Sequence, residues 1–277
     1  MRRVISTSFA TLVLCIGSTA GADDEVSVDA RVDVTITALG GAAWIASEIW
    51  KADLVSNRCR WCDRDGAGHD TLNGLDSGVR SAFKWSDTGA ANTTSSITGF
   101  VAAPLFALGG VTLGAALDHR LKDAPADALL VIESTVLAAD LNQFVKFVAM
   151  RERPFVHVLP PLDQPETAQP ADNNLSFFSG HTTLVFSLAV SAGTVMSMRH
   201  RKIAPFVWAA GLTVAVSTAY LRIAADKHYF TDVLTGAAFG SLFGFVVPFF
   251  FHAPIKSGDV AWSLVPVPGG LGVGGVY

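Results

Sequence analysis

Long apolar stretches without charge limit the folds open to this chain. Thr98 to Leu117, Ile203 to Leu221 and Val233 to Phe251 each lack charged residues and are long enough to cross the hydrocarbon core of a membrane. Thr182 to Met198 lies near the lower limit of that length. Only helices or closed barrels satisfy every backbone polar group in lipid, so we expect these segments to be helices.

Two less regular apolar segments complete the predicted bundle. Ala126 to Met150 is long but carries charges, among them Glu133 and Asp140, which lie seven residues apart and hence on one helical face. Charges are costly at membrane depth, so we expect both to make structural contacts inside the bundle. Val34 to Trp50 is short and contains Glu48, so we expect it to lie against the bundle without crossing the membrane.

The composition supports a membrane protein and argues against nucleic-acid binding. Hydrophobic residues make up 50% of the 277 residues and charged residues only 16%, whereas soluble domains carry about 25% charged residues. The net charge is −4, and the sequence shows no basic stripe that would follow a phosphate backbone. The tail from Gly258 to Tyr277 is rich in glycine and proline, so it is expected to be extended or loosely ordered.

The first residues have the pattern of an export signal. Two arginines precede an apolar run from Val4 to Ile16, and small residues offer a cleavage site after Ala22. The predicted organisation is a signal peptide at residues 1–22 followed by one domain at residues 23–277. An uncleaved signal anchor is the alternative, and either arrangement takes the chain at least partly out of the cytosol.

The cysteines indicate an oxidising compartment. Cys15 lies in the signal, which leaves Cys59 and Cys62, and a close pair in an exported protein most simply forms a disulfide that closes a turn. A redox motif would need a thioredoxin-like βαβ context, which the sequence lacks. A zinc site would need two more ligands, and only His69 is near.

Three short clusters carry the residues most suited to chemistry. They are Lys146 with Arg153, the tripeptide Ser179-Gly180-His181, and Arg222 with His228 and Asp232. In an up-and-down bundle one helix ends at Lys146 and the next begins at His181, and the same holds for Arg222 and His228, so all three clusters meet at one end. Cations, imidazoles and a helix N-terminus around one space favour a phosphate-sized anion.

The chemistry of these side chains predicts their roles. His228 and Asp232 are four residues apart and are expected to hydrogen-bond, which leaves the other imidazole nitrogen free to attack. His181 can protonate the departing oxygen as a general acid. The predicted phosphate ligands are Lys146, Arg153 and Arg222, with the Ser179 hydroxyl and the Gly180 amide as further donors.

The stretch from Lys146 to Asp232 resembles the three-part signature of the type 2 phosphatidic acid phosphatase (PAP2) family, which includes bacterial acid phosphatases and vanadium haloperoxidases. The resemblance implies a phosphohistidine intermediate on His228, release of the leaving group assisted by His181, and no metal or other cofactor. Two positions depart from the family pattern, since Phe178 stands where the second motif usually has proline and Leu221 where the third usually has serine. Neither position supplies the nucleophile or the acid.

Other conspicuous side chains are interpreted as structural. A lone histidine outside a motif usually caps a helix or lies on the surface, and this applies to His69, His119, His157, His200 and His252. Trp61 and Trp85 are expected to anchor the bundle at an interface and not to bind a substrate.

The orientation in the membrane is predicted from charge and from the cysteine pair. The basic turn Arg199 to Lys202 lies at the end of the bundle opposite the motifs, which favours that end as cytoplasmic. Cys59 and Cys62 lie at the motif end, which suits the oxidising side. Both features place the site in the periplasm, provided that Val34 to Trp50 does not cross.

These observations together predict an all-α, membrane-associated bundle of five or six main helices with the active site at one end. The expected function is hydrolysis of a phosphate monoester or diphosphate on a lipid, such as phosphatidate or a polyprenyl diphosphate, at a bacterial cell membrane. The expected partners are this lipid and the membrane, and not nucleic acid. Three rivals remain: a soluble periplasmic acid phosphatase of the same family, a vanadium-dependent haloperoxidase, and a non-catalytic anion-binding membrane protein.

Overall fold

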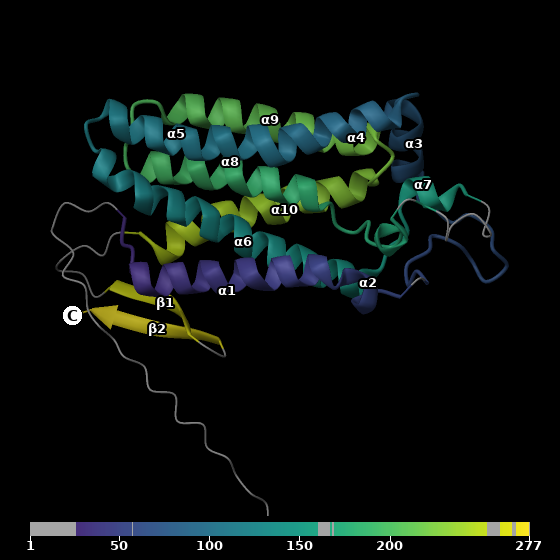
Figure 1. The fold of residues 1–277 in the computed structure, drawn as a ribbon, viewed down its shortest axis with the longest axis horizontal. Coiled ribbons are helices and arrows are strands. Elements are labelled where there is room, and N and C mark those ends of the chain that lie inside the picture. Colours follow the sequence, from purple (N-terminus) through teal and green to yellow (C-terminus); the bar gives the residue numbers. More distant parts are fainter. Residues whose placement is uncertain are drawn as a thin grey trace, which may run out of the picture.

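The structure is a computed structural model that describes residues 26–56, 58–159, 167, 169–253, 261–267 and 270–276. The predicted signal peptide at residues 1–22 lies outside these residues. The described chain forms an elongated bundle of nearly aligned helices (Figure 1). The main helices are α1 (Ala30–Ile49), α4 (Thr88–Ile97), α5 (Ala103–Leu117), α6 (Ala124–Ala149), α8 (Gly180–Met198), α9 (Ala204–Ala224) and α10 (Phe230–Val246).

Short elements join and extend these helices. They are α2 (Lys51–Leu54), α3 (Gly74–Phe83), η1 (Thr98–Ala102), η2 (Leu121–Asp123), α7 (Pro154–His157), η4 (Pro170–Asp172) and η5 (Val247–Phe251). The π-helical turn η1 joins α4 to α5 as one rod, and η5 extends α10 in the same way. Six helical segments are then long and apolar enough to cross a membrane: Ala30–Ile49, Thr88–Leu117, Leu121–Ala149, Gly180–Met198, Ala204–Ala224 and Phe230–Phe251.

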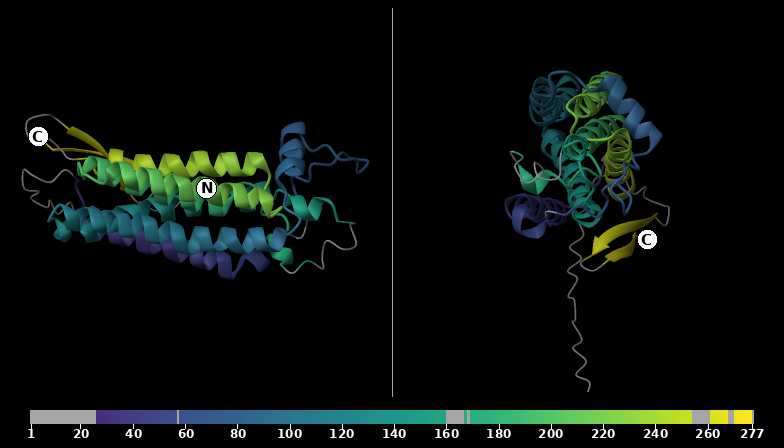
Figure 2. Two further views of the ribbon diagram at one scale, coloured as in Figure 1. Left: turned by 90° about the horizontal axis from the view of Figure 1, so that it is seen from above. Right: turned by 90° about the vertical axis from the view of Figure 1, so that its right-hand side faces the viewer.

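Helix α1 differs from its prediction. It begins at Ala30, not Val34, because the side chain of Asp29 caps it by accepting hydrogen bonds from the amides of Arg31 and Val32. At 20 residues it reaches the length of a membrane crossing, so the expectation that this segment is too short is wrong. Viewed end-on, α1 lies at the edge of the bundle (Figure 2).

Helix α8 is the centre of the bundle, and its close packing against α10 positions the site. Most of α8 is buried, whereas the other helices bury only part of their surface. Three glycines spaced four apart on α10, at positions 236, 240 and 244, face α8. A methyl group on them would lie 2.7, 2.4 and 2.8 Å from carbonyl oxygens of α8 or its N-cap, so only glycine allows this approach.

The described part of the tail is extended, one of the two alternatives that its composition predicts. Strands β1 (Ala261–Val267) and β2 (Gly270–Val276) pair antiparallel, with Ala261 opposite Val276. This pairing is the feature that the composition did not predict. The prediction of an all-α, membrane-associated bundle is confirmed for the part of the chain that precedes this hairpin.

Candidate active site

A cavity of about 730 Å³ opens at the end of the bundle that carries α2, α3 and α7. Six of the eight predicted catalytic and phosphate-binding residues line it: Lys146, Arg153, Gly180, His181, Arg222 and His228. They come from the end of α6, the loop before α7, the start of α8, the end of α9 and the loop before α10. The alternation of helix directions thus brings the three clusters together, as the sequence predicts.

His228 is held in one tautomer by a backbone carbonyl. It is 2% exposed, and its Nδ1 lies 2.8 Å from the carbonyl oxygen of Ser176, so Nδ1–H donates to that oxygen. The other ring nitrogen, Nε2, therefore carries the lone pair and lies 3.3 Å from Nη1 of Arg153. Burial lowers the pKa of His228 well below its ordinary value, and the charges of Arg153, Arg222 and Lys146 lower it further. The imidazole is kept neutral, as a nucleophile must be.

Asp232 does not make the predicted hydrogen bond with His228. Its Oδ2 is 3.8 Å from Nδ1 of His228, because His228 lies before the helix and the four-residue spacing does not place it on a shared helical face. Instead, Oδ2 accepts hydrogen bonds from the Ser176 hydroxyl at 2.6 Å and from the Tyr229 amide at 2.9 Å. Asp232 thus holds the segment whose carbonyl orients His228, and it acts through Ser176.

The cations of the cavity are held by neutral partners. Arg153 donates to the carbonyl oxygens of Asp172 and Lys227 at 2.7 and 3.1 Å. Arg222 donates through Nη1 to Asn92 Oδ1 and to the hydroxyl of Ser95, both at 2.9 Å. Among the described residues, no carboxylate lies within ion-pair distance of Arg153, Arg222 or Lys146. Their positive charge remains available for an anion.

Lys227 also lines the cavity and was not predicted. Its ammonium nitrogen lies 4.1 Å from the centre of the Phe155 ring, a cation–π contact. Burial, together with the charges of Arg153 and Arg222, lowers the pKa of Lys227 to about 8. Its place next to His228 in the sequence was the only signal that could have marked it.

In the tripeptide at the start of α8, Gly180 and His181 line the cavity, whereas Ser179 is buried away from it. The ring of His181 packs against Phe100 with 4.6 Å between ring centroids, and its buried Nε2 has no hydrogen-bond partner among the described residues. A methyl group on Gly180 would lie 2.9 Å from the Lys146 ammonium, so glycine leaves room for that cation. Ser179 is fully buried, accepts a hydrogen bond from the Thr182 hydroxyl at 2.9 Å, and is not among the cavity-lining residues. Its contact with phosphate stays a prediction.

A cluster of charged and polar side chains at the cavity wall was also not predicted from the sequence. Lys51 forms ion pairs with Glu48 at 3.0 Å and with Asp172 at 2.9 Å, and Gln143 donates to Glu48 at 2.9 Å. These residues come from α1, α2, α6 and η4, so tertiary contacts alone bring them together. Both acids of the cavity wall pair with this one lysine.

Arg151 supports the site from behind and was not singled out in the sequence. Its guanidinium is fully buried and pairs with three carboxylates, those of Asp63 at 3.1 Å, Asp76 at 2.8 Å and Asp232 at 2.7 Å. It lies between the rings of Trp61 and Tyr229, 4.2 Å from each centroid. Trp61 thus packs on this arginine, although we expected an interface anchor.

The turn that contains Trp61 is closed by a disulfide, because the sulfur atoms of Cys59 and Cys62 are bonded.

The two departures from the family pattern are buried in apolar surroundings. Phe178 stacks on Phe239 with centroids 5.3 Å apart, and Leu221 packs in a small cluster with alanines of α4 and α9. Each position therefore serves packing in this chain.

Comparisons with known proteins agree with the motif analysis. The PAP2 superfamily model matches residues 127–256. A lipid A 1-phosphatase of Porphyromonas gingivalis is 39% identical over 69 residues, which cover 25% of this chain and only 15% of that protein. The crystal structure of a transmembrane PAP2-type phosphatidylglycerolphosphate phosphatase from Bacillus subtilis covers 78% of this chain and 94% of its own, with 18% identity and a TM-score of 0.36. The region that matches the PAP2 superfamily model contains all three motif clusters.

Proposed function

We propose that this protein is a phosphatase that hydrolyses a phosphate monoester or diphosphate of a lipid through a phosphohistidine on His228. One observation carries the proposal. The Nε2 lone pair of His228 lies in a cavity beside Arg153, among cations that have no carboxylate partner in the described part of the chain. A neutral imidazole in a cationic pocket is suited to attack a phosphate and to stabilise the charge that develops.

The first step forms the phosphoenzyme. Nε2 of His228 attacks phosphorus, the bond from phosphorus to the ester oxygen breaks, and His181 gives a proton to the departing oxygen. The products are phosphohistidine and the free alcohol, or the lower phosphate when the substrate is a diphosphate. Lys146, Arg153 and Arg222 bind the equatorial oxygens, whose charge they stabilise in the transition state.

The second step restores the enzyme. Water attacks phosphorus, His181 accepts its proton as a general base, and the bond between phosphorus and Nε2 breaks. Inorganic phosphate leaves, and His228 returns to its neutral form. The hydrogen bond from Nδ1 of His228 to Ser176 stays in place throughout and keeps Nε2 directed at the substrate.

The lining of the cavity supports a lipid substrate. Trp44, Phe100 and Leu184 contribute apolar surface to it, and each belongs to a helix that is long and apolar enough to cross a membrane. Phe100 is 52% exposed beside His181, so the apolar part of a substrate can approach from the side of the bundle. The named activity of the Porphyromonas gingivalis relative, removal of a phosphate from lipid A, supports the same class of substrate.

The chemistry of the donors supports catalysis without a metal at this site. The acids of the cavity wall are Glu48 and Asp172, and both pair with Lys51. The charged group beside Nε2 of His228 is the guanidinium of Arg153, and the arginines and lysines that line the cavity attract the anion directly and repel a metal cation. We therefore expect phosphate release to persist in EDTA and to be inhibited by vanadate.

The test is phosphate release from phosphatidate, a polyprenyl diphosphate and a soluble monoester in detergent. His228→Ala should abolish turnover, whereas His181→Ala should lose most turnover yet still trap a phosphoenzyme from a substrate with a good leaving group. His69→Ala, in an exposed loop, is the matched control and should keep the wild-type rate. Near-wild-type activity of His228→Ala would refute the mechanism.

The alternative functions predict different experimental results. Extraction without detergent and a preference for soluble monoesters would indicate an acid phosphatase. Vanadate-dependent bromide oxidation would indicate a haloperoxidase. Binding of phosphate without any turnover would indicate an anion-binding protein.

The proposal also places the site on the periplasmic face. The disulfide of Cys59 and Cys62 at this end supports an oxidising side. The charge argument is weaker than it was from the sequence, because Arg199 and Arg201 are buried in ion pairs at the opposite end. Since α1 runs from the opposite end of the bundle to the cavity and is long enough to cross, this orientation requires that α1 begin on the cytoplasmic side, which a cleaved signal does not provide.

Cysteine labelling in intact cells tests the orientation. A membrane-impermeant thiol reagent should label Ser81→Cys, on exposed α3 near the site, and should not label Lys122→Cys at the opposite end. The reverse pattern would place the site in the cytoplasm and leave the proposed chemistry untouched.

A further inference from the structure

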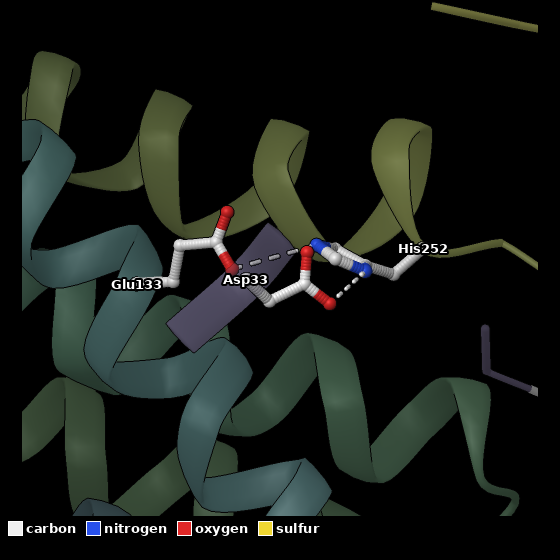
Figure 3. Close-up of side chains that lie close together, drawn as sticks. All are labelled: Asp33, Glu133 and His252. Atoms are coloured by element: carbon white, nitrogen blue, oxygen red, sulfur yellow. Dashed lines mark ion pairs between the residues drawn. The ribbon is translucent and has the colours of Figure 1, made fainter. Parts of the chain in front are cut away.

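Three buried ionisable side chains meet in the part of the bundle remote from the cavity. Asp33 lies in the first turn of α1, Glu133 in α6, and His252 directly after η5 (Figure 3). They are 5%, 3% and 4% exposed. One possible ligand atom from each lies within 4.8 Å of the others. The length of α10 and η5, about 33 Å at the usual helical rise, separates His252 from His228, and the three residues are here called the remote cluster.

Hydrogen bonding fixes the form of the imidazole in the remote cluster. Nδ1 of His252 lies 2.8 Å from the carbonyl oxygen of Ser27, so Nδ1–H donates to that oxygen. Nε2 therefore carries a lone pair, and it is directed at Oε2 of Glu133, 3.8 Å away (Figure 3). Such a bond from the distal nitrogen to a carbonyl is the usual support of a histidine that ligates a metal.

The one hydrogen-bond donor that the described residues place in the remote cluster, Nδ1–H of His252, donates to Ser27 and lies 4.0 Å from Asp33 Oδ2. Asp33 Oδ2, Glu133 Oε2 and His252 Nε2 are all buried, and none has a hydrogen-bond partner among the described residues. Three acceptor atoms that face one another out of contact with water are unfavourable unless something positive lies between them. Either a proton or a cation can supply that charge.

Asp33 and Glu133 differ from other buried acids of the bundle, which pair with arginine. Asp127 pairs with Arg199 at 2.8 Å, and Asp123 pairs with Arg201 at 2.8 Å. In contrast, the described residues place no lysine or arginine within ion-pair distance of Asp33 or Glu133, whose only such partner is His252. Two buried carboxylates with a neutral imidazole carry a charge that one divalent cation would balance.

We propose that Asp33, Glu133 and His252 bind one divalent transition-metal cation, of the class of Zn²⁺ or Mn²⁺. One imidazole nitrogen and two carboxylate oxygens form a ligand set suited to these ions. Ligands of a tetrahedral ion with bonds of about 2.1 Å lie about 3.4 Å apart. The 3.8 Å between His252 Nε2 and Glu133 Oε2 is close to that spacing. Oδ2 of Asp33 lies 4.0 Å from the other ring nitrogen, Nδ1, so the Asp33 carboxylate has to turn toward Nε2 to complete the site.

The metal would add a fixed point at the start of α1, which otherwise packs on α6 around Gly40 and accepts a hydrogen bond from Gln143 at Glu48. Asp33 is the only buried residue of α1. A bond from the metal to Asp33 joins the first turn of α1 to α6 and to the end of η5. Because α1 also contributes Trp44 and Glu48 to the active-site cavity, the ion supports the cavity wall from a distance and takes no part in phosphoryl transfer.

The direct test uses the whole protein in detergent. The purified wild type is analysed by inductively coupled plasma mass spectrometry, stripped with EDTA, and titrated separately with Zn²⁺, Mn²⁺, Mg²⁺ and Ca²⁺ while its melting temperature is followed. We expect about one transition ion per chain before stripping and a rise of several degrees in melting temperature with Zn²⁺ or Mn²⁺. Mg²⁺ and Ca²⁺ should have a much smaller effect.

Isosteric variants assign the binding to the remote cluster. Asp33→Asn with Glu133→Gln removes both negative charges while keeping the side-chain shapes, so it should fold and lose at least about 100-fold in metal affinity. Asp140→Asn, two turns further along α6, is the control and should bind metal as the wild type does. Phosphate release well below the melting temperature should be the same with and without the ion.

Two outcomes would overturn the inference. Stripped wild-type protein that gains no stability from any of the four ions would show that a shared proton balances the remote cluster. Binding that is unchanged in the double variant would show that the ion sits elsewhere. The His228→Ala variant separates this inference from the proposed function, because it should lose turnover and keep metal binding.

Discussion

Replacement of Arg151 by methionine is the sharpest test of how the active site is built. The substitution keeps an unbranched side chain between Trp61 and Tyr229 but removes the charge that three carboxylates share. Two of those acids, Asp76 and Asp232, are fully buried, so they cannot turn to water. Breaking a buried ion pair by removing one partner costs about 3–5 kcal/mol.

The expected effect on stability is large enough to measure directly. At about 2–4 °C per kcal/mol for a domain of this size, Arg151→Met should lower the melting temperature by about 6–20 °C. Thermal unfolding in detergent, followed by tryptophan fluorescence, measures this shift, and Trp61 reports on the local change. Arg60→Met is the control, because Arg60 is exposed in the same disulfide-bonded turn and should change the melting temperature by less than about 2 °C.

A double variant distinguishes a charge effect from simple loss of packing. If uncompensated charge causes the loss, then Arg151→Met with Asp232→Asn should melt above Arg151→Met alone, since the second change removes one of the unpaired acids. Turnover should be low in the single variant, because Asp232 loses the arginine that fixes its position. It should stay low in the double variant, because the carboxylate that holds Ser176, and with it the carbonyl that orients His228, is gone. A single variant that melts within 2 °C of the wild type and keeps its kcat would refute the reasoning.

Three further predictions concern the pH dependence of His228 and of Lys227, and the disulfide. Because the pKa of His228 is lowered, its imidazole stays neutral as the pH falls below 6.5, so its protonation should not reduce kcat/KM of the free enzyme between pH 7.5 and 6.5. The lowered pKa of Lys227 means that its charge is lost near pH 8, and a fall in kcat/KM there should move to higher pH in Lys227→Arg. Exchange of Cys59 and Cys62 for serine should lower the melting temperature by a few degrees with turnover retained, because Trp61 in that turn packs on Arg151.

The parts of the fold that the sequence predicted are those set by local pattern. Uncharged apolar length marked the long helices, and alternating helix directions brought Lys146, His181 and His228 to one cavity. The ends of the helices were predicted less well from the sequence. Asp29 extends α1 to Ala30 by a side-chain cap, a contact that hydropathy does not measure.

The errors at the site share one physical cause. The spacing of His228 and Asp232 predicted a hydrogen bond only if both were helical, and the helix starts at Phe230. Once His228 lies outside it, the carbonyl of Ser176, 52 residues away in sequence, becomes its partner. Lys227 and Arg151 were missed for the same reason, since their roles depend on partners that only the tertiary fold brings near.

Gly180 offers a last test, because its size and not its flexibility is what the site requires. Gly180 is the first residue of α8 and does not have a positive φ angle. A methyl group on it would lie 2.9 Å from the ammonium of Lys146 and 3.0 Å from Oδ1 of Asn142. The end of a lysine side chain can move, so Gly180→Ala should fold with a melting temperature close to that of the wild type. The displaced ammonium would no longer reach the phosphate, and kcat/KM should fall about 10- to 100-fold, a loss typical of one misplaced transition-state contact. Gly109→Ala in α5, where no atom lies within 4 Å of the added methyl group, should keep full activity. Equal kcat/KM for the two variants would mean that Lys146 does not bind the phosphate.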